Sequence, residues 1–175
     1  MTDGFDVWIA SFDLHDEDDP GTPPEGLPEF LRATFDTHGA VSRDEVRRLY
    51  YERESELAHK AVALFVADVE RTSTFNPSIN IRRDEHGTLI VSYNGNYSTP
   101  ATLAIRAPET ICEVADNLRD HVVDDLSAAW PVCPTHGFGL DPRSVKGHAV
   151  WFCRHGDHSV SAIGQLPSSA AARMG

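Results

Sequence analysis

Residues 130–166 read WPVCPTHGFGLDPRSVKGHAVWFCRHGDHSVSAIGQL, and this stretch carries the most specific chemical pattern in the chain. Its CPTHG segment at 133–137 has the form of a zinc knuckle, in which two ligands three positions apart bind one tetrahedral ion. The proline helps to set the turn. The glycine tolerates a positive φ and leaves its amide free to donate to the ligating sulfur. The spacing therefore predicts two metal ligands, Cys133 and His136.

A second pair of candidate ligands, Cys153 and His158, follows after sixteen residues. This separation suits a ribbon or finger whose two tips converge on one ion. His155 competes with His158 for the fourth position, because Cys153 and His155 in an extended chain could also share a face. The four residues between Cys153 and His158 allow a turn, which favours His158. The predicted ligands are Cys133, His136, Cys153 and His158, and the predicted ion is Zn2+.

The alternative interpretation is that these cysteines and histidines, two of three and a few of nine in the chain, are ordinary core and surface residues. CPxHG followed by C-x4-H is more specific than a lone CxxC and less specific than two CxxC pairs. The remaining cysteine, Cys112, lies on the apolar side of a helical pattern, which is typical of a buried free thiol. An odd number of cysteines fits a reducing compartment and metal binding better than a disulfide framework.

The flanking sequence predicts an α+β fold with long helices. Ser42 followed by Glu45 has capping-box spacing, and apolar residues then recur at helical intervals up to Thr72. A shorter helix is predicted from Leu27, and a third begins at Pro108. Alternating apolar residues at 79–81, 89–93 and 102–106 predict a three-stranded antiparallel meander between the long helices. Two more strands, at 149–153 and 159–163, predict a small zinc-ribbon-like ββ module.

The predicted domain organisation has four parts. Residues 1–28 form an acidic N-terminal segment and linker, in which alternation at 5–9 is compatible with a short strand. Residues 29–130 form the α+β core domain, residues 131–166 the zinc-binding module, and residues 167–175 a C-terminal tail. We expect the core to fold without metal, because its amphipathic helices and alternating strands can bury a core of their own.

Charge and hydropathy restrict the class of protein. The hydrophobic fraction is 41%, and no apolar run approaches the roughly 20 residues that span a bilayer. The N-terminus lacks a basic, apolar leader, so we expect no membrane association and a cytoplasmic location. The net charge is -12, with nine acidic residues and no Lys or Arg in residues 1–30. Such a chain is repelled by phosphate backbones, so a nucleic-acid partner is not expected.

The stretch from Trp130 to Leu166 resembles small uncharacterised actinobacterial proteins with a WPxCPxH segment, a later WxC, a nearby His and an IGxL ending. This resemblance covers about a fifth of the chain and implies metal binding without implying a reaction. The predicted order of helices and strands is also similar to that of acidic secretion-chaperone-like domains, which is a likeness of fold alone.

The leading functional hypothesis is a non-enzymatic, protein-interaction or chaperone-like domain with a structural zinc site and another protein as its partner. The alternative is a zinc-dependent hydrolase with an open metal site, in which Asp141 or Asp157 acts as general base. A third hypothesis is nucleic-acid binding through Arg143, Lys146 and Arg154 of the zinc module. No catalytic residue is assigned, and a homodimer is left open.

Overall fold

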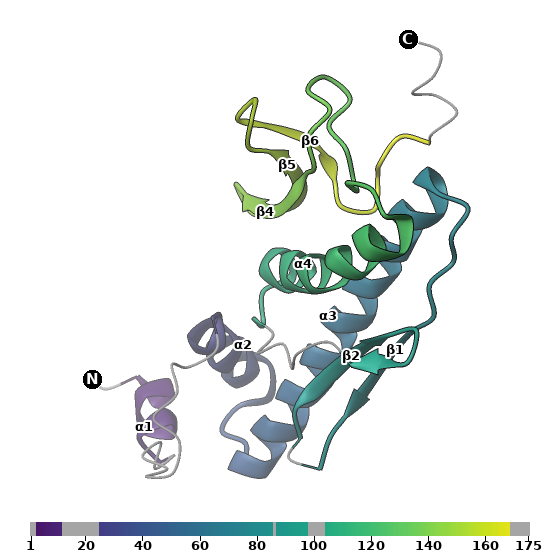
Figure 1. Ribbon diagram of the computed structural model, residues 1–175. Helices are drawn as coiled ribbons and strands as arrows, with labels where there is room; N and C mark the ends of the chain where they lie inside the picture. The colour runs from purple at the N-terminus through teal and green to yellow at the C-terminus, as the bar shows by residue number, and fades with distance from the viewer. Residues whose placement is uncertain (1–2, 12–24, 86, 98–103, 169–175) are drawn as a thin grey trace.

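The computed structural model of the protein describes residues 3–11, 25–85, 87–97 and 104–168. These residues form an α+β fold with four helices and two three-stranded antiparallel sheets. Helix α4 lies against the long helix α3 and contacts both sheets, which occupy different sides of it (Figure 1). The elements are α1 (Gly4–Ala10), α2 (Leu27–His38), α3 (Arg43–Thr72), β1 (Ile79–Arg83), β2 (Leu89–Tyr93), β3 (Asn96–Tyr97), α4 (Ala107–Leu126), β4 (Asp141–Val145), β5 (His148–Cys153) and β6 (His158–Ala162).

The long helix α3 begins and ends as the sequence predicts. The Ser42 side chain accepts a hydrogen bond from the amide of Glu45, which satisfies one of the free N–H groups at the helix start. Thirty residues at about 1.5 Å each make α3 about 45 Å long. The helix therefore supports α2 near one end and the second sheet near the other (Figure 1).

The strand predicted at 5–9 is wrong, because these residues belong to helix α1. The Asp3 side chain caps the helix by accepting from the amide of Phe5. Phe5 and Trp8, three positions apart, both pack against Phe35 of α2, with ring centroids 5.7 and 5.3 Å away. Val7 is 61% exposed, as expected for a helix with one buried side. Phe5 fits both the alternation of a strand and the spacing of a helix, and its packing against α2 accompanies the helical form.

The first sheet is the predicted meander with a different third strand. Strands β1 and β2 pair in antiparallel register from Ile79 opposite Tyr93 to Arg83 opposite Leu89, and β3 then pairs with the end of β2. The third strand was predicted at 102–106. Residues 102 and 103 lie outside the described part of the chain, and residues 104–106 are not in a strand. The short strand β3 follows the turn at 94–95 directly, and hairpins close most readily over such short turns.

The second sheet has three strands in the order β4-β5-β6, so the predicted ββ pair is incomplete. Strands β5 and β6 match the predicted strands to within one residue at each end. The sequence did not indicate β4, because its residues DPRSV are polar and include Pro142, which lacks an amide hydrogen. Strand β4 tolerates the proline because it is an edge strand.

One hydrophobic core extends from α3, β2 and α4 into the second sheet. The rings of Phe65, Trp130 and Trp151 form its centre, with Trp130 in edge contact with each of the others at 5.3 and 5.6 Å. Residues of the predicted core domain and of the predicted zinc-binding module therefore contribute to one hydrophobic core.

The carboxylate of Asp68 on α3 joins that helix to the second sheet. It accepts hydrogen bonds from the Trp151 indole at 2.7 Å and from the amides of Gly164 at 2.6 Å and Leu166 at 2.7 Å. Arg71, one turn later, donates to the Gly164 carbonyl. Asp68 is fully buried, and this burial raises the pKa of its carboxyl against the lowering effect of the three donors.

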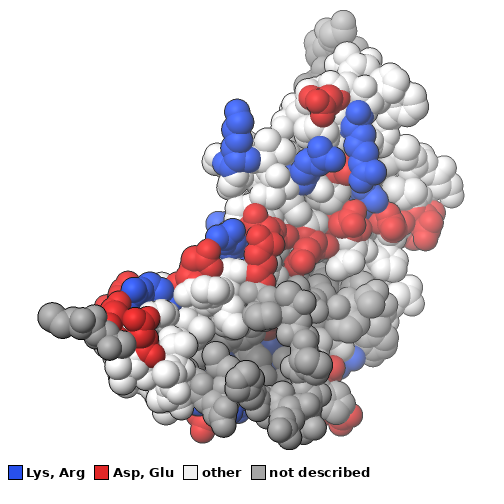
Figure 2. All heavy atoms as spheres, turned by 90° about the vertical axis from the view of Figure 1, so that its left-hand side faces the viewer, with Lys and Arg blue, Asp and Glu red and all other residues white. Residues whose placement is uncertain are grey.

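Charge is distributed unevenly over these elements. Helix α4 carries six acidic residues and a single arginine, Arg119, whereas the second sheet and its turns carry Arg143, Lys146 and Arg154. Figure 2 shows Lys and Arg side chains on the upper part of the molecule and a band of Asp and Glu side chains below them. Within the described residues, no helix has both the length and the apolar composition needed to cross a bilayer.

Candidate metal centre

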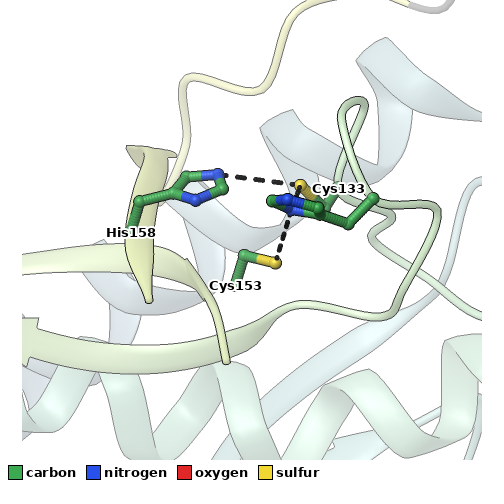
Figure 3. Close-up of side chains that lie close together, drawn as sticks. Cys133, Cys153 and His158 are labelled. Carbon is green, nitrogen blue, oxygen red and sulfur yellow. Dashed lines mark hydrogen bonds between the residues drawn. The ribbon is translucent and has the colours of Figure 1, made fainter. Parts of the chain in front are cut away.

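The side chains of Cys133, His136, Cys153 and His158 lie together at one end of the second sheet. One ligand atom from each of the four can be chosen so that all lie within 4.8 Å of one another. Figure 3 shows Cys133, Cys153 and His158 converging from separate segments of the chain. No other group of three or more such side chains occurs in the part of the chain that the structure describes. The four residues could therefore hold a metal ion.

The distances between sulfur and nitrogen atoms match a tetrahedral site. Nδ1 of His136 lies 3.5 Å from Sγ of Cys133 and 3.4 Å from Sγ of Cys153, and Nε2 of His158 lies 3.7 Å from Sγ of Cys133. Zinc–sulfur bonds of about 2.3 Å and zinc–nitrogen bonds of about 2.0 Å at tetrahedral angles place sulfur and nitrogen about 3.5 Å apart. These three separations are those expected between sulfur and nitrogen ligands of one tetrahedral ion.

Cys133 and His136 come from a tight loop at residues 132–139, here called the knuckle loop. The loop is closed by hydrogen bonds from the amide of Cys133 to the Phe138 carbonyl and from the amide of Gly137 to the Cys133 carbonyl. Gly137 has a φ of 71°, which confirms the predicted need for glycine. Its amide was predicted to donate to the ligating sulfur, and this is wrong because the Cys133 carbonyl takes that hydrogen bond.

The sulfur of Cys133 is prepared for metal binding as a thiolate. Burial acts to raise the pKa of Cys133, but hydrogen bonds from the backbone amides of His136 and Thr135 and from the side chains of His136 and Cys153 together outweigh that effect, so the pKa falls to about 6. Thiolate is the form of cysteine that binds metals. The Cys112 thiol is different, because burial raises its pKa to about 11. Cys112 also lies outside the cluster.

Cys153 and His158 are paired across the β5–β6 hairpin. Cys153 is the last residue of β5, His158 is the first of β6, and the two stand opposite each other in the ladder. The turn at 154–157 between them is the one that the sequence favours. His155 lies in this turn and is exposed. Its ring packs against His136 and Phe138, with centroids 5.2 and 4.5 Å away, and it is not part of the cluster.

The two carboxylates considered as a general base lie outside the ligand cluster. Asp141 forms ion pairs with Arg119 at 2.8 Å and with Arg154 at 2.6 Å. Both oxygens of this carboxylate are therefore engaged by arginine side chains. Asp157 is exposed in the turn at 154–157, with a φ of 47°.

The three basic residues considered for nucleic-acid binding do not all stand free. Arg154 pairs with Asp141, and the guanidinium of Arg143 lies 4.2 Å above the Phe152 ring, while Lys146 is exposed in the β4–β5 turn.

The contacts that support the site were not predicted from the sequence. Gly156 lies against both histidine rings, and Trp151 fixes strand β5 to Asp68. The sequence placed Gly156 in the turn between the candidate ligands, but it did not indicate that this residue would contact both histidine rings. Asp68 carries no local signal, since its partners lie 83 to 98 positions further along the chain.

Comparisons of this chain with models of known protein families, with curated proteins and with solved structures found no match. The class of site is defined by the residues themselves: a Cys2His2-type cluster that could bind a metal ion, carried by an α+β fold.

Proposed function

We propose that this protein binds one Zn2+ ion through Cys133, His136, Cys153 and His158, and that the ion closes a zinc-ribbon-like module. The observation that carries the proposal is the convergence of four ligand atoms, from the knuckle loop and the β5–β6 hairpin, at distances that suit one tetrahedral ion. Two thiolates with two imidazoles form a donor set that zinc prefers, since zinc is borderline soft and accepts tetrahedral geometry without penalty.

The proposed role of the ion is structural. Four protein ligands fill a tetrahedral coordination sphere, whereas a catalytic zinc keeps one position open for water or substrate. The burial of both cysteines and the pairing of Asp141 with two arginines also favour a structural ion over a hydrolytic one. The knuckle loop would then be held in place by the ion, because so short a segment buries little apolar surface by itself.

We further propose that the domain is non-enzymatic and binds another protein. Val132 and Phe138 on the knuckle loop expose apolar side chains, with 43% and 54% of their surface accessible. Exposed apolar groups on a rigid loop can serve as contacts for a protein partner. The net charge of -12 makes a protein a better candidate than a nucleic acid.

The zinc proposal is tested by metal analysis of purified protein. The expected content is about one zinc per chain, and C133S or C153S should lower it at least several-fold, because serine is a poor zinc ligand. The matched control is C112S, which removes the remaining thiol and should keep full occupancy. Full zinc occupancy in both C133S and C153S would overturn the proposal.

The partner proposal is tested separately by affinity capture with the zinc-loaded protein and with the F138S variant. A protein retained by the former and lost with the latter supports it. Retention of nucleic acid that does not depend on Phe138 would contradict it.

A further inference from the structure

Gly156, in the turn at 154–157, is packed against two of the proposed ligands. A Cβ atom built on Gly156 would lie 2.2 Å from Cε1 and 2.8 Å from Nδ1 of His136, and 2.7 Å from Nδ1 of His158. Carbon atoms do not approach imidazole rings so closely, since van der Waals contact needs about 3.5 Å. Any side chain at this position must therefore displace a histidine ring.

Position 156 requires glycine because neighbouring side chains leave no room for a Cβ atom, and not because of its backbone conformation. Gly156 does not have a positive φ, so an L-residue could adopt its backbone conformation. Gly139 on the knuckle loop shares this property, and a Cβ there would meet no atom within 4 Å. The two glycines differ chiefly in what surrounds them.

The carbonyl of Gly156 determines which nitrogen of His158 can bind a metal. Nδ1 of His158 lies 3.2 Å from this carbonyl oxygen. Because a carbonyl only accepts hydrogen bonds, Nδ1 must carry the proton, and Nε2 is left with its lone pair. Nε2 is the atom that faces Sγ of Cys133 at 3.7 Å.

His136 presents the opposite nitrogen to the site. Its Nδ1 lies 3.5 and 3.4 Å from the two cysteine sulfurs, so Nδ1 must be the unprotonated atom when a metal binds. The Cε1 edge of this ring, next to Nδ1, is the part that a side chain at Gly156 would strike first.

We propose that Gly156 is a positioning residue of the metal centre: its carbonyl selects the Nε2-binding form of His158, and its missing side chain makes room for the Nδ1-binding ring of His136. This inference rests on the proposed zinc binding. A hydrogen bond from the second nitrogen of a ligating histidine fixes both ring orientation and protonation, and it is the usual way in which a protein supports such a ligand.

The first test uses the unmodified chain loaded with zinc. Long-range 1H–15N correlation spectra of the imidazoles should show a proton on Nδ1 of His158 and a proton on Nε2 of His136. If His158 binds through Nδ1, or if both histidines bind through the same nitrogen, the inference is overturned while zinc binding stands. If the chain takes up no zinc, the proposed function itself fails.

The second test compares G156A with G139A in zinc competition titrations. We expect G156A to weaken zinc binding about 10- to 100-fold, as loss of a supporting contact to a ligand commonly does. G139A should change the affinity less than about twofold, since its new methyl group meets open space. Equal affinities for G156A and the unmodified chain would overturn the inference.

A double variant separates ring displacement from general damage to the fold. In the H136A background, two of the three close contacts of the new methyl group are gone, so adding G156A should weaken zinc binding clearly less than it does alone. The same fold-loss in both backgrounds would mean that G156A acts through the hairpin as a whole, which would contradict the proposed role.

Discussion

At the scale of single residues, the histidine at position 158 and its neighbour at 155 have separate tasks. His158 stands opposite Cys153 in the ladder and presents Nε2 to Cys133. His155 packs over Phe138 and His136. His155 therefore covers the proposed ligand His136 and does not replace one.

We predict that H158A lowers zinc affinity far more than H155A, by at least tenfold, because H158A removes a ligand and H155A only a ring that packs against one. Competition with a chromophoric chelator measures both constants. Similar losses in the two variants would mean that the fourth ligand exchanges between the two histidines.

The candidate ligand residues are the part of the site that the sequence allows one to predict. Cys133 and His136 lie in one loop, and Cys153 and His158 face each other across one hairpin, so each pair is specified by a short spacing. Contacts between distant segments have no such spacing. The hydrogen bond between Asp68 and Trp151 joins residues 83 positions apart, and only the folded chain brings them together.

At the scale of elements, helices were predicted more reliably than strands. The capping residue Ser42 and the apolar spacing of α3 and α4 are local features, and these helices form as predicted. Strand β4 was not predicted, because an edge strand needs no apolar alternation and can include a proline such as Pro142. The strand interpretation of residues 5–9 failed because the buried side of α1 is defined by its packing on α2, which comes later in the sequence.

The joint between α3 and the second sheet gives a prediction at this scale. In D68N, one oxygen that accepts buried N–H groups becomes an NH2 group, which leaves a donor facing a donor. Loss of a buried acceptor costs about 1 to 3 kcal/mol of unfolding free energy, and we expect D68N to lie near the upper end. Urea unfolding followed by tryptophan fluorescence measures the change.

The control for D68N is E70Q, which removes the same charge from an exposed position of the same helix. It should change the free energy of unfolding by less than about 0.5 kcal/mol. Should D68N be as stable as E70Q, the second sheet would not depend on Asp68 for its attachment.

At the scale of the whole molecule, the continuous core determines how far the structural effect of removing the metal extends. Chelation should deprotect the amides of the knuckle loop and the hairpin turn, because the ion is proposed to hold these two segments together. The amides of Gly164 and Leu166 should stay protected longer, since they donate to buried Asp68. The middle of α3, which packs on α4, should change little.

Hydrogen exchange with and without chelator measures this gradient. Equal loss of protection in α3 and the knuckle loop would show that the metal is integral to the entire core. No change anywhere would show that the ion is not structural, and an open, hydrolytic site would gain support.

Mild acid should remove the stabilisation provided by the metal, as the chelator does. Imidazoles and thiolates bind zinc only without their protons, so the stabilisation that the proposed ion provides depends on pH. It is lost as the pH falls, because protons compete for His136, His158 and the cysteine thiolates. The thermal unfolding temperature of the zinc-loaded protein should therefore fall steeply below about pH 6.5. The unfolding temperature of the chelated protein should not fall in that range. If the unfolding temperatures of the two forms fall in parallel with pH, the structural role proposed for the ion is contradicted.

The edge contact between Trp130 and Trp151 also has an optical consequence. The two indoles lie 5.6 Å apart with their planes at 74°, one two residues before the knuckle loop and one inside β5. Electronic transitions of neighbouring indoles in a fixed, non-parallel arrangement couple and give a paired positive and negative band in circular dichroism. The third tryptophan, Trp8, packs with α2 and has no place in this pair. The chain thus carries an intrinsic chiroptical reporter, whose signal would follow the attachment of the second sheet without any added dye.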